Sequence, residues 1–209
     1  MTTEELFALL VLATVGSFTP GPNTALSTTL AANHGLRVAL PFVCAVPCGW
    51  GLLLLACSGG LGALVQQFPA VRWGLLGFGG LYLLWLASRL ARTTQLAAQQ
   101  HQAVVVGFVQ GVSLQFLNPK AWFLAISVTS GWVIGFGNTV ARVIEVLPLF
   151  MFFGLSSNLT YACIGAALRE WLQGPDGTAR RLVAFNRVMA LSLVATVLWM
   201  VRSTAGMGA

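Results

Sequence analysis

Charged residues are scarce in this chain of 209 residues: they make up 8% of it, whereas hydrophobic residues make up 57%. A soluble domain carries roughly a quarter charged residues, so the composition excludes an ordinary soluble enzyme or binding module. Apolar runs long enough to span a bilayer recur along the whole length. The sequence therefore predicts a single all-α integral membrane domain over residues 1–209.

Carboxylate and imidazole groups are missing from the centres of the apolar runs. Glu145 comes nearest, at the edge of the fifth run, and both histidines, His34 and His101, fall in links between runs. Without an intramembrane His, Asp or Glu, neither a metalloprotease centre nor a Ser–His site can be assembled. An enzyme is therefore excluded, and no cofactor and no bound metal is expected.

Cysteine is also rare, and all four cysteines lie in apolar runs. They are Cys44, Cys48, Cys57 and Cys163. Cys44 and Cys48 are four residues apart and share one helix face, a spacing that a soft metal ion could use. Because no Asp, Glu or His nearby completes a ligand set, packing between helices is the favoured interpretation. A heavy-metal or cation efflux protein is kept as the alternative function.

The net charge of +6 does not indicate nucleic-acid binding, because the basic residues lie mostly in short links between apolar runs. There they act as topology signals and as contacts for anionic headgroups. Alternate links hold Arg37, Arg89, Arg92, Arg169, Arg180 and Arg181, and the opposite side holds Arg72, Arg142 and Arg202. The positive-inside rule then places both termini outside the cytoplasm. Glu4 and Glu5 stand where a cleavable signal carries basic residues, so the first run is expected to stay in the mature protein.

Six apolar segments are predicted to span the membrane. They are Leu6–Ala32, Val38–Val65, Pro69–Ser88, Val104–Thr129, Val146–Leu168 and Leu182–Val201. A Gln-rich link over 89–103, predicted to be cytoplasmic, separates a first repeat, 1–88, from a second repeat, 104–209. Three spans per half place the second half upside down relative to the first, which is the inverted-repeat plan of many secondary transporters. Broken helices are expected in spans 1 and 4.

The first break is predicted over Thr19-Pro20-Gly21-Pro22-Asn23. Pro20 and Pro22 remove two backbone donors, which leaves the carbonyls of Gly16 and Phe18 without intrahelical partners. At membrane depth such groups persist only where they are buried in protein or line a wet cavity. The flanking threonine and asparagine add polar groups, and a half-helix starting here would direct its positive N-terminal end at an anion. A simple kink is the alternative.

The second break is predicted at Asn118-Pro119-Lys120, with Lys120 about midway along the fourth span. Insertion of lysine at a helix centre is unfavourable by about 2.5–3.5 kcal/mol, so a lysine without a role is not expected there. A lysine removed from water can hold or release a proton, which suits a transport site. The alternative is that Lys120 snorkels to an interface.

Together the two breaks supply what a zwitterion needs. Free carbonyls suit an ammonium group, and a half-helix N-terminus or Lys120 suits a carboxylate. Asn158 in the fifth span is a further candidate, which could face the pathway or bond a neighbouring helix. The candidate substrate-binding residues are Thr19, Pro20, Gly21, Pro22, Asn23, Asn118, Pro119, Lys120 and Asn158.

At these motifs the chain resembles the LysE/RhtB family of amino-acid exporters. The matching elements are Thr19-Pro20-Gly21-Pro22-Asn23, His34-Gly35 with Arg37, Gly80-Leu81-Tyr82-Leu83-Leu84-Trp85, and Gln115-Phe116-Leu117-Asn118-Pro119-Lys120-Ala121. The likeness covers nearly the whole chain, and the run 114–118 with the Asn158 region is most similar to the cysteine/O-acetylserine exporter branch. Many relatives carry an acidic residue after the glycine of the second span, whereas Gly49 is followed here by Trp50. A carboxylate proton carrier is therefore not expected.

The resemblance implies export of amino acids or related small zwitterions across the bacterial inner membrane, driven by the proton gradient without ATP. The expected partners are a small-molecule amino-acid substrate and the lipid bilayer, with no nucleic acid, and a homodimer is left open. A non-transporting membrane assembly factor is a third option, which substrate flux in vesicles would separate from an exporter.

Overall fold

The computed structural model describes residues 1–93, 105–173 and 180–206, and the secondary structure in these ranges is entirely helical. In chain order the elements are α1 (Thr3–Phe18), α2 (Pro22–His34), α3 (Leu36–Ala56), a π-helical turn (Cys57–Leu61), α4 (Gly62–Gln67), α5 (Pro69–Ala91), α6 (Phe108–Leu117), α7 (Pro119–Val128), a second π-helical turn (Thr129–Val133), α8 (Thr139–Gln173) and α9 (Arg180–Gly206). The prediction of an all-α protein is confirmed. The predicted link over 89–103 falls largely outside the described residues.

Four stretches of the described chain are long and apolar enough to cross a membrane. They are Leu36–Gln67, Pro69–Ala91, Thr139–Leu172 and Arg180–Arg202. A fifth is obtained if α1 and α2, which meet at an angle of 47°, are taken as one bent span. α6 is apolar but shorter. The chain is thus a multi-pass membrane protein, and the count of six spans stays a prediction.

The last two long helices extend well past their predicted apolar limits. α8 begins at Thr139 rather than Val146, because the side chain of Asn138 accepts hydrogen bonds from the backbone N–H groups of Val140 and Ala141 and so caps the helix at its N-terminus. Hydropathy marks only the apolar middle of such a helix, whereas capping residues decide where it begins.

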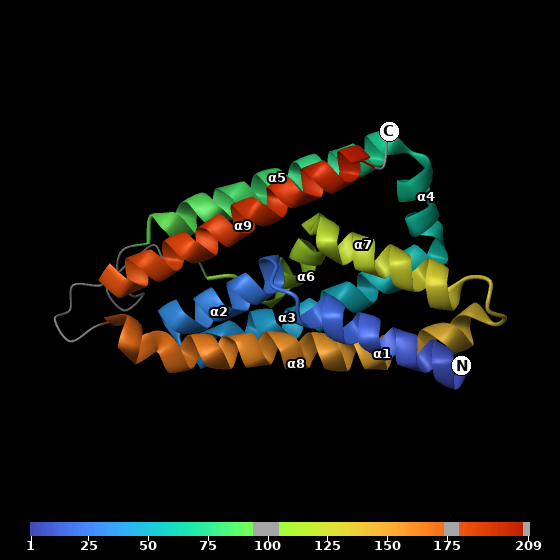
Figure 1. The fold of residues 1–209 in the computed structure, drawn as a ribbon, viewed down its shortest axis with the longest axis horizontal. Coiled ribbons are helices and arrows are strands. Elements are labelled where there is room, and N and C mark those ends of the chain that lie inside the picture. The colour runs from blue at the N-terminus through green and yellow to red at the C-terminus, as the bar shows by residue number, and fades with distance from the viewer. Residues whose placement is uncertain (94–104, 174–179, 207–209) are drawn as a thin grey trace.

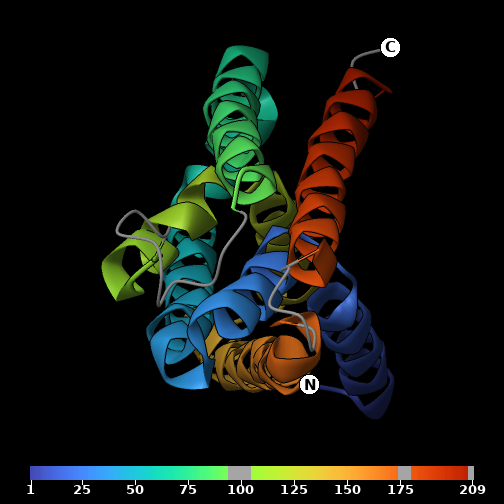
Figure 2. The ribbon, with the colours of Figure 1, turned by 90° about the vertical axis from the view of Figure 1, so that its left-hand side faces the viewer.

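The helices run back and forth along the long axis of the molecule (Figure 1). α8 lies along one side, α5 and α9 lie side by side on the other, and α1 and α2 follow each other end to end between them. The N-terminus and the last described residues lie at the same end of the molecule. Viewed along that axis, α2 lies in the middle of the bundle, in contact with α3, α8 and α9 (Figure 2).

The central position of α2 follows from its small and polar composition. Every residue of Pro22–His34 is buried except Asn23 and His34. Small side chains let neighbouring helices approach closely. At Gly165 of α8 a Cβ atom would lie only 2.1 Å from the carbonyl oxygen of Thr28, so α8 rests directly on the backbone of α2.

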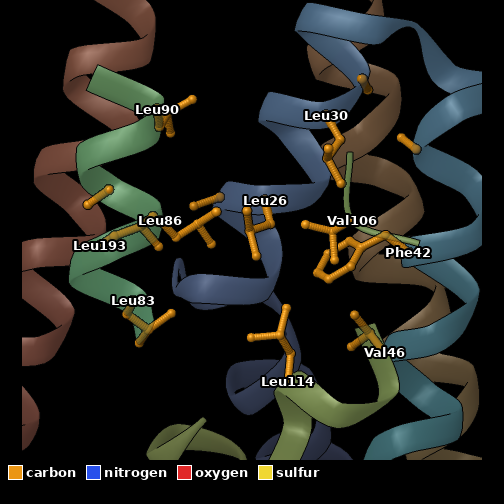
Figure 3. Close-up of a cluster of buried hydrophobic side chains, with 14 of the residues drawn as sticks. Leu26, Leu30, Phe42, Val46, Leu83, Leu86, Leu90, Val106, Leu114 and Leu193 are labelled. Carbon is orange, nitrogen blue, oxygen red and sulfur yellow. The ribbon is translucent and has the colours of Figure 1, made fainter. Parts of the chain in front are cut away.

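Two hydrophobic clusters hold the bundle together. The first joins α2, α3, α5, α6 and α9 through side chains such as Leu26, Phe42 and Leu86 (Figure 3). The second joins α1, α3, α7 and α8 and includes Trp50 and Phe150. The candidate site lies between the clusters, since its lining draws on both of them.

Candidate functional site

The first helix break is built by its two prolines. α1 ends at Phe18 and α2 begins at Pro22, the helical position where a missing N–H matters least. The carbonyl of Phe18 accepts a hydrogen bond from the hydroxyl of Tyr161 on α8, at 2.9 Å. Gly21 has an extended backbone and exchanges hydrogen bonds with the hydroxyl of Thr24, which caps α2. The carbonyl of Phe18 thus has no partner within its own helix, as expected, but it already accepts one hydrogen bond from another helix.

The second break repeats this plan in the other half of the chain. α6 ends at Leu117, Asn118 is extended, and α7 begins at Pro119. A residue before proline is disfavoured in the helical region, which explains the interruption at Asn118. The side-chain oxygen of Asn118 accepts from the backbone N–H of Lys120 at 3.1 Å, so the asparagine caps α7.

A pair of amides joins the two breaks. The side chain of Asn23 donates to Gln115 at 2.8 Å, and the side chain of Gln115 donates back to Asn23 at 3.2 Å. Gln115 is completely buried, and its amide also donates to the carbonyl of Gly111. The side chain of Asn118 approaches Asn23 at 3.5 Å. Residues about a hundred positions apart in the sequence therefore form one polar cluster.

Lys120 reaches across from the second break to the first. Its Nζ atom donates to the main-chain carbonyl of Thr19 at 2.7 Å. The side chain passes so close to Gly21 that a Cβ atom there would lie 3.2 Å from both Cδ and Nζ of the lysine. Among the described residues no carboxylate lies within ion-pair distance of Lys120. The amine is thus held at a backbone carbonyl rather than by a counter-charge.

A cavity of about 60 Å³ lies between the two breaks and the facing helices, which is room for several water molecules. Its lining consists of Gly16, Ser17, Thr19, Gly21, Pro22, Asn23, Thr24, Val46, Pro47, Trp50, Asn118, Lys120, Ala121, Leu124, Phe150, Gly154, Ser157 and Asn158. Lys120 is the one charged member of that set. The lining therefore combines one positive charge and polar groups from both breaks and from α8 with apolar groups that include Trp50 and Phe150.

Most of the predicted site residues meet at this cavity. Those that line it are Thr19, Gly21, Pro22, Asn23, Asn118, Lys120 and Asn158. Pro20 and Pro119 are not part of the lining, and they contribute by interrupting the backbone. Whether these residues bind substrate stays a prediction, but the structure places their side chains around one space.

Asn158 makes the interhelical hydrogen bond that was one of its two interpretations, and it also lines the cavity. Its side-chain oxygen accepts from the hydroxyl of Ser27 on α2 at 2.9 Å, and its amide donates to the carbonyl of Gly154 at 2.8 Å. The side chain is 3% exposed and lines the cavity. It therefore ties α8 to α2 and presents a polar group to the site.

Several residues around the cavity were not predicted as site residues. The sequence carries a signal for some of them and none for others. Gln115 is an amide inside an apolar span, which is the same signal that drew attention to Asn158. Tyr161 lies three residues after Asn158, on the same face of α8. Trp50 and Phe150, whose rings stack at 4.7 Å, carry no local signal, because aromatic residues are ordinary in a membrane helix.

The cysteine pair lies apart from the cavity. Cys44 is exposed and Cys48 is partly exposed on α3, and neither belongs to the lining. In the described ranges no group of three or more histidine, cysteine or acidic side chains is arranged to hold a metal ion. The geometry thus gives the metal-efflux alternative no support.

Comparison with known proteins identifies the class. The LysE type translocator model matches residues 14–203, so the chain belongs to that family and is a membrane transport protein rather than an enzyme. It is similar to the cysteine/O-acetylserine efflux protein of Salmonella choleraesuis (strain SC-B67), with 30% identity over 165 residues, 79% of this chain and 84% of the relative. The proteins of the same name from Klebsiella pneumoniae and Escherichia coli (strain K12) are 29% and 28% identical over the same shares. No solved structure matches the chain significantly. The family resemblance predicted from the motifs is confirmed.

Proposed function

We propose that this translocator exports small amino acids from the cytoplasm and that the cavity between the helix breaks is its substrate site. The observation that carries the proposal is the position of Lys120, the one charged group in the cavity lining. A cation that is partly removed from water is unfavourable unless it has a partner, and no described carboxylate pairs with this one. An ammonium group has three donors, of which one reaches Thr19, so the others can bind a substrate carboxylate.

The helix ends around the cavity add to this polarity. α2 and α7 both begin at the breaks, where Pro22 and Asn118 line the cavity, so their positive ends lie beside Lys120. The end of α1, with Ser17 and Thr19 in the lining, contributes the negative end of a helix. The carboxylate of a zwitterion fits this arrangement beside Lys120 and the positive ends of α2 and α7, while Lys120 itself already occupies the carbonyl of Thr19 at the end of α1.

The relatives suggest the size of the substrate. Cysteine and O-acetylserine, after which they are named, are neutral at the side chain and small. A compact cavity with one cationic group suits amino acids of this kind better than substrates with a charged side chain. We therefore extend the proposal to neutral amino acids of about this size.

The arrangement of the helices supports the inverted-repeat plan of six spans. In that plan α1–α2, α3 and α5 form one half, and α6–α7, α8 and α9 form the other. α3 packs on α8, and α5 packs on α9, so the second and third spans of one half meet their counterparts in the other. The N-terminus and the last described residues lie at one end of the molecule, as an even number of crossings requires. With the arginine distribution, this end is assigned to the outside of the cytoplasm.

Export is proposed to be coupled to the proton gradient, with Lys120 as the proton carrier. Lysine is the one ionisable side chain among the cavity-lining residues, and an amine that is partly removed from water can release its proton and take it back. Driving export by this gradient requires exchange, in which a proton enters the cytoplasm as a substrate molecule leaves it. A homodimer of such units stays a prediction from the sequence.

The direct test is flux in everted vesicles from cells that overexpress the chain. Because everted vesicles take up what cells export, an imposed proton gradient should drive uptake of cysteine-sized neutral amino acids. Lys120→Met should abolish this uptake at equal protein levels. If wild-type vesicles take up none of a panel of amino acids, the proposed function is wrong.

A further inference from the structure

A stacked aromatic pair forms part of the cavity lining, beside the residues of the two helix breaks. Trp50 of α3 and Phe150 of α8 both line the cavity, and their rings stack with centroids 4.7 Å apart and an interplanar angle of 20°. Both side chains are almost fully buried, at 7% and 3% exposure. Aromatic pairs of this geometry are stable and rigid, so they give a ligand a fixed surface.

The indole N–H of Trp50 has no acceptor among the described residues. Its Nε1 atom is buried without a hydrogen-bond partner. A buried tryptophan N–H usually finds one, and two other tryptophans in this chain do so. Trp122 donates to the carbonyl of Phe116 at 2.8 Å, and Trp132 donates to the carbonyl of Glu5 at 3.0 Å. Trp50, unlike Trp122 and Trp132, is part of the cavity lining.

Building on the proposed export of amino acids, we propose that Trp50 determines which side chain the substrate carries. The substrate's α-carboxylate lies at Lys120, and its side chain lies against Trp50 and Phe150, where an oxygen atom of that side chain accepts the indole hydrogen bond. The site then favours short neutral amino acids whose side chain bears an acceptor, such as an ester or hydroxyl oxygen. Apolar side chains of equal size leave the donor unsatisfied, and a site built around a buried polar group rejects such analogues.

The test compares two substrates that differ only in acceptor atoms. O-acetylserine carries an ester, and homoleucine is its apolar isostere, with carbon in place of both ester oxygens. In everted vesicles the wild-type protein should take up O-acetylserine about five- to tenfold faster than homoleucine at subsaturating concentrations, as expected for one hydrogen bond. Trp50→Phe should remove that preference, mainly by slowing uptake of O-acetylserine.

Trp122→Phe is the matched control, because it removes an indole N–H of equal burial that does not line the cavity. It should change both fluxes in the same proportion. Phe150→Leu should slow both substrates while keeping the preference, because it leaves the donor in place. A preference that survives Trp50→Phe would overturn the proposal, as would an equal loss of both fluxes in that variant, which would mean that the donor serves a group common to the two substrates.

The wild-type measurement keeps the proposal testable even where Trp50→Phe does not reach the membrane. Equal uptake of O-acetylserine and homoleucine by the wild-type protein would overturn the role of Trp50 and leave amino-acid export intact. Absence of uptake for either substrate and for the rest of the amino-acid panel would instead overturn the proposed function itself.

Discussion

The ammonium group of Lys120 lies 2.7 Å from the main-chain carbonyl oxygen of Thr19, so a single side chain connects the two helix breaks. The lysine begins at the start of α7 and ends beside the last turn of α1. Its charge is thereby fixed at the point where the positive ends of two half-helices face one space. A substrate carboxylate that binds there must either replace the Thr19 carbonyl as the partner of Lys120 or bind the remaining N–H groups of the lysine.

Substitution of Lys120 should separate its two proposed roles. Lys120→Met should lose substrate exchange and gradient-driven flux alike, because no cation remains in the cavity. Lys120→Arg should retain part of the exchange of labelled for unlabelled substrate but should not respond to a proton gradient, since arginine does not release its proton at accessible pH. Both rates are measured in vesicles at equal expression. Near-normal transport by Lys120→Met would contradict both roles and leave snorkelling to an interface as the explanation of the lysine's position.

Removal of the two prolines should repair the first break. In the double variant Pro20→Ala and Pro22→Ala the missing backbone donors return, so the carbonyls of Gly16 and Phe18 can be recaptured within one continuous helix. Export should fall at least about tenfold. Straightening the helix moves Thr19 and Asn23 relative to Lys120, and even a small displacement of such groups impairs a functional site. Pro41→Ala is the control, since Pro41 lies inside α3, which continues through it, and does not line the cavity. Wild-type flux in the double variant would show that the break is only a kink without a role in transport.

The amide pair between Asn23 and Gln115 should contribute to stability as a unit. Gln115→Leu leaves the side chain of Asn23 without its main partner, which should destabilise the protein by about 1–3 kcal/mol. Adding Asn23→Ala should then be less harmful than in the wild-type background, because the partner has already been lost. Thermal unfolding in detergent gives the four melting temperatures of the cycle. Strictly additive effects would show that the pair does not act as one.

Gly165 should tolerate no side chain. A Cβ atom there would lie 2.1 Å from the carbonyl oxygen of Thr28, so Gly165→Ala requires α8 to move away from the backbone of α2. We expect a loss of several °C in the unfolding midpoint and a matching loss of correctly inserted protein. Gly74→Ala on α5 is the matched control, because a Cβ atom at that position would have nothing within 4 Å and alanine favours the helix. Equal behaviour of the two variants would contradict the close packing of α2 and α8.

Reporter fusions at the C-terminus should indicate that the C-terminus lies outside the cytoplasm. The arginine distribution assigns both chain ends to that side, and the fold brings them to one end of the molecule. A phosphatase that is active only outside the cytoplasm should work at this position, and a fluorescent protein that matures only inside should stay dark. The reverse pattern would contradict the proposed orientation.

The sequence predicts the features of this protein that depend on local chemistry. Apolar runs give the helical membrane class, and the prolines at 20, 22 and 119 give the points where helices end and begin. Lys120 is identified as part of the site because its burial is unfavourable without a role. Each of these inferences needs only a residue and its immediate neighbours.

The tertiary contacts around the site could not be predicted in the same way. Tyr161 takes the carbonyl of Phe18, and Gln115 pairs with Asn23, only because α8 and α6 lie beside the first break. Nothing in the spacing of polar residues along one chain tells which helices are neighbours. The stacking of Trp50 on Phe150 cannot be predicted from the sequence either, because it depends on how α3 and α8 cross.

The two halves of the first span, α2 and α1, differ in how tightly they are packed in the bundle. Ser27 bonds Asn158 on α8, Asn33 bonds Asn186 on α9, and α8 touches the α2 backbone at Thr28. α1, in contrast, buries only Leu9 and Ala13 along its length. α2 is therefore the more firmly held half of the first span, while α1 is joined to α8 at its ends, where the Tyr161 hydroxyl donates to the carbonyl of Phe18 and Arg142 pairs with Glu5.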